Sequence, residues 1–145
     1  MATMNFQVTT VGEGATGRHQ TANAEFWSTE TRLGGTPAQP TPLELLLGSL
    51  TGCMNVILQM VAGEKGWRHV SAKYSVKGEL DPRGMMGDPG IPPYFRRIEL
   101  KVWVSGVDRE QLNWVRDEVD RRCPVHRLFE QAQISIDELW EITQS

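Results

Sequence analysis

The sequence predicts an α+β fold, and three observations lead to this fold class. The segment Thr41–Lys65 is apolar over almost its whole length and is long enough for a single helix. Segments before and after it alternate apolar with polar residues, as half-buried strands do. Two shorter helical segments then precede a last strand. An order of strands, one long helix, two strands, two helices and a final strand is typical of α+β proteins.

The N-terminal region is expected to form a β-hairpin. Apolar and polar residues alternate over Phe6–Thr10, a turn is predicted over Gly12–Gly17, and the alternation resumes over Ala22–Phe26. Residues 34–42 follow with two glycines and three prolines. This stretch is too rich in such residues for regular structure, so we expect a loop that leads into the long helix.

The ends of the long helix are marked in the sequence. Thr41 is a suitable N-cap, Pro42 suits the first helical position, and Glu44 lies near the positive end of the helix dipole. Gly63 and Gly66 mark the C-terminal end. Because leucine, isoleucine, valine and methionine occur on every side of the helical wheel, the helix is expected to be enclosed on all sides.

An apolar segment of this length could also span a bilayer. Glu44, Asn55 and Gln59 interrupt it or lie at its edge, and no basic cluster precedes it. The remaining segments are amphipathic and need a core on which to pack. The sequence therefore predicts a buried helix in a soluble protein with no membrane association.

Gly48 and Gly52 place small residues four positions apart on the long helix. Such spacing allows two helix backbones to approach closely, although small residues could equally fit beneath a sheet. The first alternative requires a partner helix, and no second segment of this chain is long and apolar enough. The same helix of another copy would then be the partner.

The C-terminal half is expected to contain three strands and two helices. Residues 69–79 and 94–107 have the alternation of strands, and the glycine- and proline-rich loop 81–93 between them is a candidate rim or lid. Asp108 is expected to cap a helix that ends at Arg122. Because a proline follows Cys123, a second helix is predicted over residues 125–131, with a last strand over 133–142.

Composition and charge exclude several classes of protein. A chain of 145 residues is expected to form one domain, here residues 1–145, with a sizeable core. Its net charge of -3 gives no basic field for nucleic acid. The N-terminus lacks the pattern of a secretory signal, so a cytoplasmic location is expected. In that reducing compartment, two distant cysteines are expected to be thiols, a transient redox pair or metal ligands rather than a structural disulfide.

Each cysteine lies in a predicted helical context. Cys123 precedes a helix whose free N–H groups and dipole favour a thiolate, and a lowered pKa is expected. Positive charge nearby would add to this effect, from Arg121, Arg122, His126 and Arg127. Cys53 lies within the long helix, and either cysteine could simply be a small buried residue. Taken together, they suggest a cycle in which one thiolate attacks a peroxide, becomes a sulfenic acid and condenses with the second thiol.

Two motifs resemble those of the OsmC/Ohr family of organic hydroperoxide reductases. The first is Thr-Pro-x-Glu-Leu-Leu-Leu followed by small residues and Gly-Cys, over Thr41–Cys53, and the second is Cys-Pro-Val, over Cys123–Val125. The order of elements over nearly the whole chain agrees. Within the family, the sequence is most similar to an OsmC-like branch whose helix begins with Thr-Pro-Leu-Glu-Leu. The resemblance implies an intertwined homodimer in which two long central helices are wrapped by antiparallel sheets and two active sites lie at the subunit interface.

The resemblance also implies roles for particular residues. Cys53 matches the peroxidatic cysteine and Cys123 the resolving one, while Arg18 is the best match for an arginine that stabilises the thiolate, with Arg32 second. The family's peroxidases place a glutamate directly after the helix-opening proline, where Leu43 stands here. Glu44 follows one residue later, on the opposite side of the helix from Cys53. It is expected to act across the dimer or to hold Arg18 indirectly.

The predicted function is thiol-dependent reduction of organic hydroperoxides, with an external dithiol as reductant and neither cofactor nor metal. One alternative is a binding protein for a small hydrophobic ligand such as an acyl chain, with little turnover. Another is a metal site formed by Cys53, Cys123 and His126 with His19 or His69. The spacing of these residues matches no closed zinc pattern.

Overall fold

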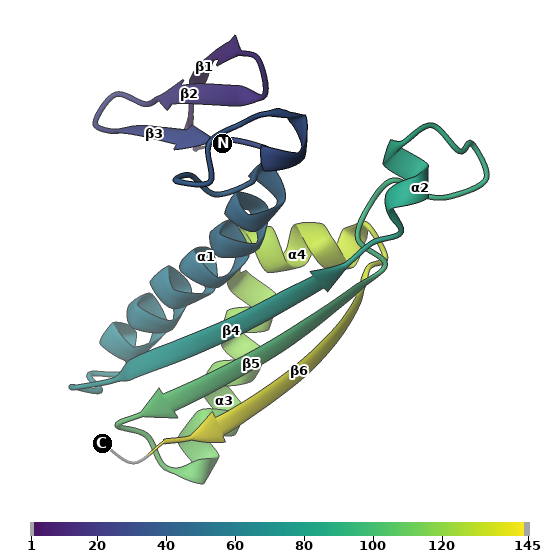
Figure 1. Ribbon diagram of the computed structural model, residues 1–145. Helices are drawn as coiled ribbons and strands as arrows, with labels where there is room; N and C mark the ends of the chain where they lie inside the picture. Colours follow the sequence, from purple (N-terminus) through teal and green to yellow (C-terminus); the bar gives the residue numbers. More distant parts are fainter. Residues whose placement is uncertain (1, 144–145) are drawn as a thin grey trace. The chain divides into compact units, whose positions relative to one another are not determined.

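The computed structural model describes residues 2–143 and confirms an α+β fold (Figure 1). The described chain divides between Leu46 and Leu47 into two compact units. We call them the N-terminal unit and the C-terminal unit and describe each by itself. The long helix α1 (Pro42–Glu64) begins in the first unit and continues through the second.

The N-terminal unit contains a three-stranded antiparallel sheet. Its strands are β1 (Thr9–Glu13), β2 (Thr16–Gln20) and β3 (Glu25–Ser28), in that order. The hairpin was predicted with too long a turn. Gly14 adopts φ 56°, which glycine tolerates and most residues do not, so the chain reverses over residues 14–15 and β2 forms where the turn was expected.

The region between β3 and α1 is mostly irregular, as predicted. It contains a short 3₁₀ turn, η1 (Thr31–Leu33), which Glu30 caps by accepting a hydrogen bond from the Arg32 N–H. A hydrogen bond joins the two ends of this loop, because the Thr29 N–H donates to the Pro40 carbonyl at 2.9 Å. The loop is thereby closed just before α1 begins.

The predicted ends of α1 are confirmed. The Glu44 N–H donates to Thr41 Oγ1 at 3.2 Å, and the Thr41 N–H donates to Glu44 Oε1 at 2.9 Å. These reciprocal bonds form a capping box, which satisfies two N–H groups that a helix start leaves free. At the other end, Gly66 adopts φ 72° and the Trp67 N–H donates to the Ala62 carbonyl. This is a glycine-based helix end of the Schellman type.

One side of α1 is buried and the opposite side is exposed. The buried residues are Leu50, Met54, Ile57, Leu58, Val61 and Ala62. On the other side Gly48 and Gly52 are exposed, Val56 is 59% exposed and Met60 is 47% exposed. The core of the described chain covers one side of α1 only. Enclosure of the other side by a second copy stays a prediction.

Among the described residues, α1 is also the one helix whose length and hydropathy would allow it to cross a membrane. Its apolar side instead belongs to the core of the C-terminal unit, where Leu50, Met54, Leu58 and Val61 share one cluster with the sheet residues Ile98 to Val104. Packing on protein accounts for this side of the helix.

The C-terminal unit is built on a second three-stranded sheet. Its strands are β4 (Ser71–Glu79), β5 (Arg97–Ser105) and β6 (Ser135–Ile142). β4 and β5 pair antiparallel, as expected, whereas β5 and β6 pair parallel. Parallel strands need a long connection, because the chain must return to the end of the sheet where the first strand began. The two helices between β5 and β6 provide this connection.

These two helices are α3 (Arg109–Arg122) and α4 (Pro124–Gln131), and both lie behind the sheet in Figure 1. Asp108 and Gln111 form a capping box at the start of α3, which confirms Asp108 as the N-cap. The buried residues of α3 are Leu112, Val115 and Val119. Trp67, just after α1, packs edge-on against Trp114 of α3, so the long helix and α3 are neighbours in one core.

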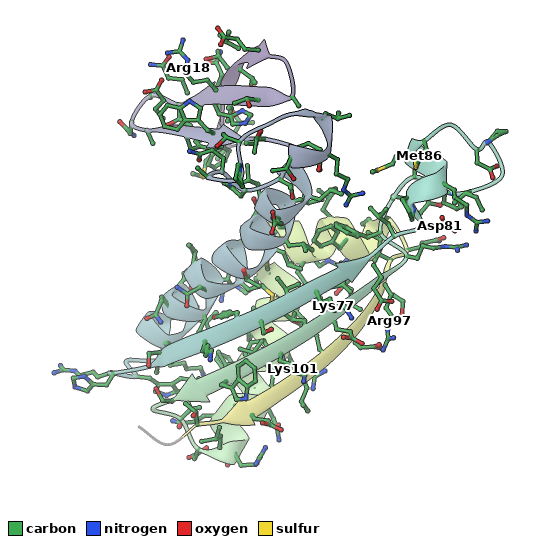
Figure 2. All side chains as sticks on the ribbon, viewed as in Figure 1. Arg18, Lys77, Asp81, Met86, Arg97 and Lys101 are labelled. Atoms are coloured by element: carbon green, nitrogen blue, oxygen red, sulfur yellow. The ribbon has the colours of Figure 1, made fainter. Side chains whose placement is uncertain are left out.

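The other face of this sheet is open and charged. Lys77, Arg97 and Lys101 project from it (Figure 2). Arg97 lies 2.8 Å from Asp137 and 3.0 Å from Glu99 on the neighbouring positions. Residues 81–93, predicted as a loop, include one short helix, α2 (Pro82–Met85), because Asp81 caps it by accepting a hydrogen bond from the Arg83 N–H.

Candidate functional site

The two cysteines, far apart in sequence, meet in the core of the C-terminal unit. Cys53 is partly exposed on α1 and packs against the buried cluster to which Cys123 belongs. The thiols are close enough that the Cys53 side chain is one of the groups that raise the pKa of Cys123. A mid-helix thiol and a thiol at a helix start are thus brought together.

The break between α3 and α4 positions Cys123. Its N–H donates to the Val119 carbonyl at 2.9 Å and completes α3, while its carbonyl accepts from the Arg127 N–H at 3.0 Å and begins α4. Pro124 fits this place because the first position of a helix needs no N–H donor. Cys123 therefore belongs to both helix ends, and its backbone is extended between them.

The predicted low pKa of Cys123 is wrong. Cys123 is fully buried, and burial raises the pKa of its thiol to about 11; the neighbouring Cys53 adds to the rise. The backbone N–H groups of His126 and Val125 act in the opposite direction, as the helix-dipole argument predicts, but their effect is smaller. Desolvation of the charged form outweighs the helix N-terminus.

The basic side chains expected to help the thiolate are paired elsewhere. Arg122 Nη2 lies 2.7 Å from Glu64 Oε1, Arg121 Nη2 lies 2.8 Å from Glu118 Oε2, and Arg127 pairs with Glu130. The His126 ring contacts carboxylates of α3, α4 and β6. Their positive charge is therefore directed to carboxylates, and the groups that lower the pKa of Cys123 are backbone N–H groups.

Tyr74 is a further member of the site that the sequence did not identify. Burial raises its pKa, and the Cys123 thiol adds to the rise, so the phenol lies near this cysteine. The Tyr74 hydroxyl donates to Asn55 Oδ1 on α1 at 3.2 Å. In the sequence it was one apolar-side residue of a predicted strand, and no spacing distinguished it from Ala72 or Val76.

The candidate arginines belong to the N-terminal unit. Arg18 lies on β2, where its Nη1 is 3.2 Å from Glu25 Oε1 and its side chain is 55% exposed (Figure 2). Strand pairing places it between Val11 and Trp27, and the three residues help to line a pocket of about 140 Å³. Arg32, the second candidate, lies 3.5 Å from Glu30.

Glu44 has a defined local role in the same unit. Its carboxylate accepts the Thr41 N–H, and hydrogen bonds from the Thr41 backbone and hydroxyl lower its pKa. The side chain therefore stabilises the start of α1 as an anion.

The OsmC-like protein family model matches residues 35–138, which include both cysteines and most of the elements described above. The chain belongs to the OsmC-like family. No curated protein matches it in sequence.

Solved structures of this family have the same fold. An OsmC-like protein from Mycoplasma pneumoniae superposes with a TM-score of 0.79 at 18% identity, over 97% of each chain. The organic hydroperoxide resistance protein OsmC from Legionella pneumophila gives 0.68 at 15% identity, over 99% of each. The organic hydroperoxide resistance protein OhrB of Bacillus subtilis gives 0.63 at 18% identity, over 97% of this chain and 98% of that one. At these identities the likeness establishes the fold.

Proposed function

We propose that this OsmC-like protein reduces organic hydroperoxides with its two thiols. The observation that carries the proposal is that Cys53 and Cys123 are neighbours in one core although they come from different helices. Membership in a family with structural relatives named as organic hydroperoxide resistance proteins supports the substrate class.

The proposed chemistry has three steps. The Cys53 thiolate attacks the distal peroxide oxygen, the O–O bond breaks, and an alcohol leaves after its alkoxide takes a proton, while Cys53 becomes a sulfenic acid. The Cys123 sulfur then attacks the Cys53 sulfur, and a disulfide forms with release of water. An external dithiol finally reduces this disulfide and is itself oxidised, which restores both thiols.

The different surroundings of the two thiols support this division of roles. Cys53 is partly exposed, so a peroxide from solvent can reach it, whereas Cys123 is enclosed. With a pKa of about 11, Cys123 stays protonated at neutral pH and competes little as a first nucleophile. The apolar residues around both thiols favour an organic peroxide.

Arg18 is our candidate for stabilising the Cys53 thiolate and the developing alkoxide, with Arg32 as second choice and Glu44 as a positioning residue. An arginine at the reacting oxygens offers two donors and a charge that does not titrate. We further propose that residues 1–145 act as one domain in a homodimer, in the reducing cytoplasm where dithiol reductants are abundant. The exposed side of α1, with Gly48 and Gly52 on its surface, supports a second copy as the partner.

A second candidate function is binding of a small hydrophobic ligand, such as an acyl chain, with little turnover. It is favoured by Leu43, which stands where the peroxidases carry a glutamate and is 40% exposed. A loosely held arginine stabilises a thiolate less, which would leave an apolar pocket without efficient chemistry.

The deciding experiment uses the fact that the chain has only two cysteines. The reduced protein is mixed with one equivalent of an alkyl hydroperoxide, free thiols are counted, and a Cys53–Cys123 bond is sought by mass spectrometry. We expect both thiols to be lost in the native chain. In Cys123→Ser we expect Cys53 to stop at the sulfenic acid, and in Cys53→Ser we expect Cys123 to survive. Survival of both thiols in excess peroxide would refute the enzyme proposal and favour ligand binding.

A further inference from the structure

A second group of titratable side chains lies in the C-terminal unit, outside the thiol site. Asp120 near the end of α3, His126 on α4 and Glu138 on β6 converge there, and we call these three residues the Asp-His-Glu cluster. They line a pocket of about 300 Å³ together with Arg116, Glu130, Ile134 and Ile136. The cluster brings three different elements to one point.

The donor atoms of the cluster have the spacing of metal ligands. One atom from each side chain lies within 4.8 Å of the others, and His126 Nε2 is 3.3 Å from Asp120 Oδ1. Ligands held about 2.0–2.2 Å from a tetrahedral zinc ion lie about 3.3–3.6 Å apart. His126 Nε2 also contacts Glu138 Oε1. Small side-chain movements would therefore place an ion among the three atoms.

The cluster is largely buried, and two of its polar atoms form no aligned hydrogen bond. The His126 and Glu138 side chains are 4% and 6% exposed. Among the described residues, Asp120 Oδ1 and His126 Nδ1 are buried and form no aligned hydrogen bond, although the Asp120 carboxyl group is hydrogen-bonded to Glu138. Buried polar atoms normally find partners, because an atom without one has lost its hydrogen bonds to water and gained none in return.

Residues around the cluster hold its members in place, as outer partners do at metal sites. Trp140 Nε1 donates to Glu138 Oε2 at 2.9 Å, which leaves Oε1 facing His126. His126 Nδ1 lies 2.8 Å from Glu130 Oε1, although the geometry is not that of an aligned hydrogen bond. A modest ring rotation would let Nδ1–H donate to Glu130 while Nε2 faces the ion. A metal ion binds the ring nitrogen once it has displaced the proton there, and such a carboxylate partner then fixes the tautomer and the orientation of the ring.

We propose that Asp120, His126 and Glu138 bind a divalent transition-metal ion such as Zn²⁺. One imidazole nitrogen and two carboxylate oxygens suit zinc and its first-row neighbours better than they suit soft, thiolate-preferring ions. Three protein ligands leave a further position that faces the pocket. The site uses neither cysteine and is therefore independent of the proposed thiol chemistry.

The test starts from the Cys53→Ser/Cys123→Ser chain, in which no thiolate can bind the ion. After treatment with a chelator and dialysis, the protein is titrated with Co²⁺ by absorption and with Zn²⁺ by calorimetry. We expect one ion per chain, visible Co²⁺ bands of an oxygen and nitrogen site, and no thiolate charge-transfer band. Glu138→Gln and Asp120→Asn should each weaken binding at least ~10-fold. The matched control is Glu141→Gln, an exposed position on the same strand, which should bind normally.

Circular dichroism establishes that each variant is folded. If Glu138→Gln does not fold, Asp120→Asn provides the same comparison at a side chain that is 25% exposed. The proposal is overturned if the thiol-free chain shows no saturable binding up to about 1 mM metal, or if the folded cluster variants bind as tightly as the Glu141→Gln control.

Discussion

Cys53 and Cys123 share one core, but their surroundings differ in the property that decides thiol reactivity. Cys53 lies on the border between the buried and the exposed side of α1 and is partly open. Cys123 has the helix start that usually activates a thiol, yet it is fully buried and its pKa rises to about 11. The comparison teaches that a helix N-terminus activates a thiol only where solvent or a free cation also stabilises the charge.

The largest effect expected from this difference is in alkylation rates. In Cys53→Ser, the remaining thiol Cys123 should react with a maleimide about 10³-fold more slowly at pH 8 in the folded than in the unfolded chain, because its raised pKa and its enclosure both act. In Cys123→Ser, the remaining Cys53 should be protected much less. Rates are followed by mass spectrometry with and without denaturant. If folding slowed alkylation of the two thiols equally, the proposed difference in their reactivity would be refuted.

The next effect concerns pH and the step that forms the disulfide. A pKa of about 11 lies above the ordinary thiol value, so the thiolate fraction of Cys123 is small at pH 7 and rises tenfold for each pH unit. The rate of disulfide formation after peroxide addition should therefore rise about 100-fold between pH 7 and pH 9. Stopped-flow tryptophan fluorescence can follow disulfide formation. The Cys123→Ser variant is the control, because its fluorescence trace should lack the phase due to this step. A rate independent of pH would show that Cys123 is not the titrating nucleophile.

A smaller effect is expected on self-association through the exposed side of α1, which adjoins Cys53. Val56→Glu places a charge on that side and should weaken the proposed self-association at least ~10-fold, because the partner would have to bury it. Light scattering across a concentration series measures the dissociation constant. Met86→Glu is the matched control, since Met86 is 80% exposed on a loop. If the two variants behave alike, the exposed side of α1 is not the interface.

The smallest effect concerns the start of the helix that carries Cys53. Thr41→Ala removes the N-cap hydroxyl and should lower the free energy of unfolding by about 1 kcal/mol in a denaturant titration. Glu44→Gln keeps an acceptor for the Thr41 N–H but removes the negative charge at the start of the helix, so it should lower stability by less than Thr41→Ala does. The same variant tests the positioning role, because a carboxylate that orients Arg18 is lost while the cap remains. Unchanged peroxide turnover in Glu44→Gln would restrict Glu44 to capping.

Much of the fold could be predicted because local signals and packing agree. The capping residues Thr41 and Asp108 and the alternation of β5 placed helix starts and strands within a few residues. The parallel pairing of β6 and the third strand of the N-terminal sheet were missed, because pairing partners are set by tertiary contacts and the alternation of a single strand does not report them.

The identity of the two candidate cysteines could be predicted from the sequence, but the burial and the charged neighbours of these cysteines could not. Sequence motifs selected Cys53 and Cys123, but burial of Cys123 and the pairing of Arg122 with Glu64 depend on which elements pack together. Tyr74 and the Asp-His-Glu cluster were missed for the same reason. Their members come from different elements, and no regular spacing in the sequence connects them.

Because the two thiols lie far apart in the sequence, their oxidation to a disulfide would close a large covalent ring in the chain. A bond between Cys53 and Cys123 would close a ring that contains β4, β5 and α3, the central part of the C-terminal unit. Closing a loop of this size removes conformational entropy from the unfolded chain, by about 4 kcal/mol in the simple entropic account. The oxidised protein would then resist unfolding and proteolysis more than the reduced one, and the lifetime of the chain would depend on how recently it met peroxide.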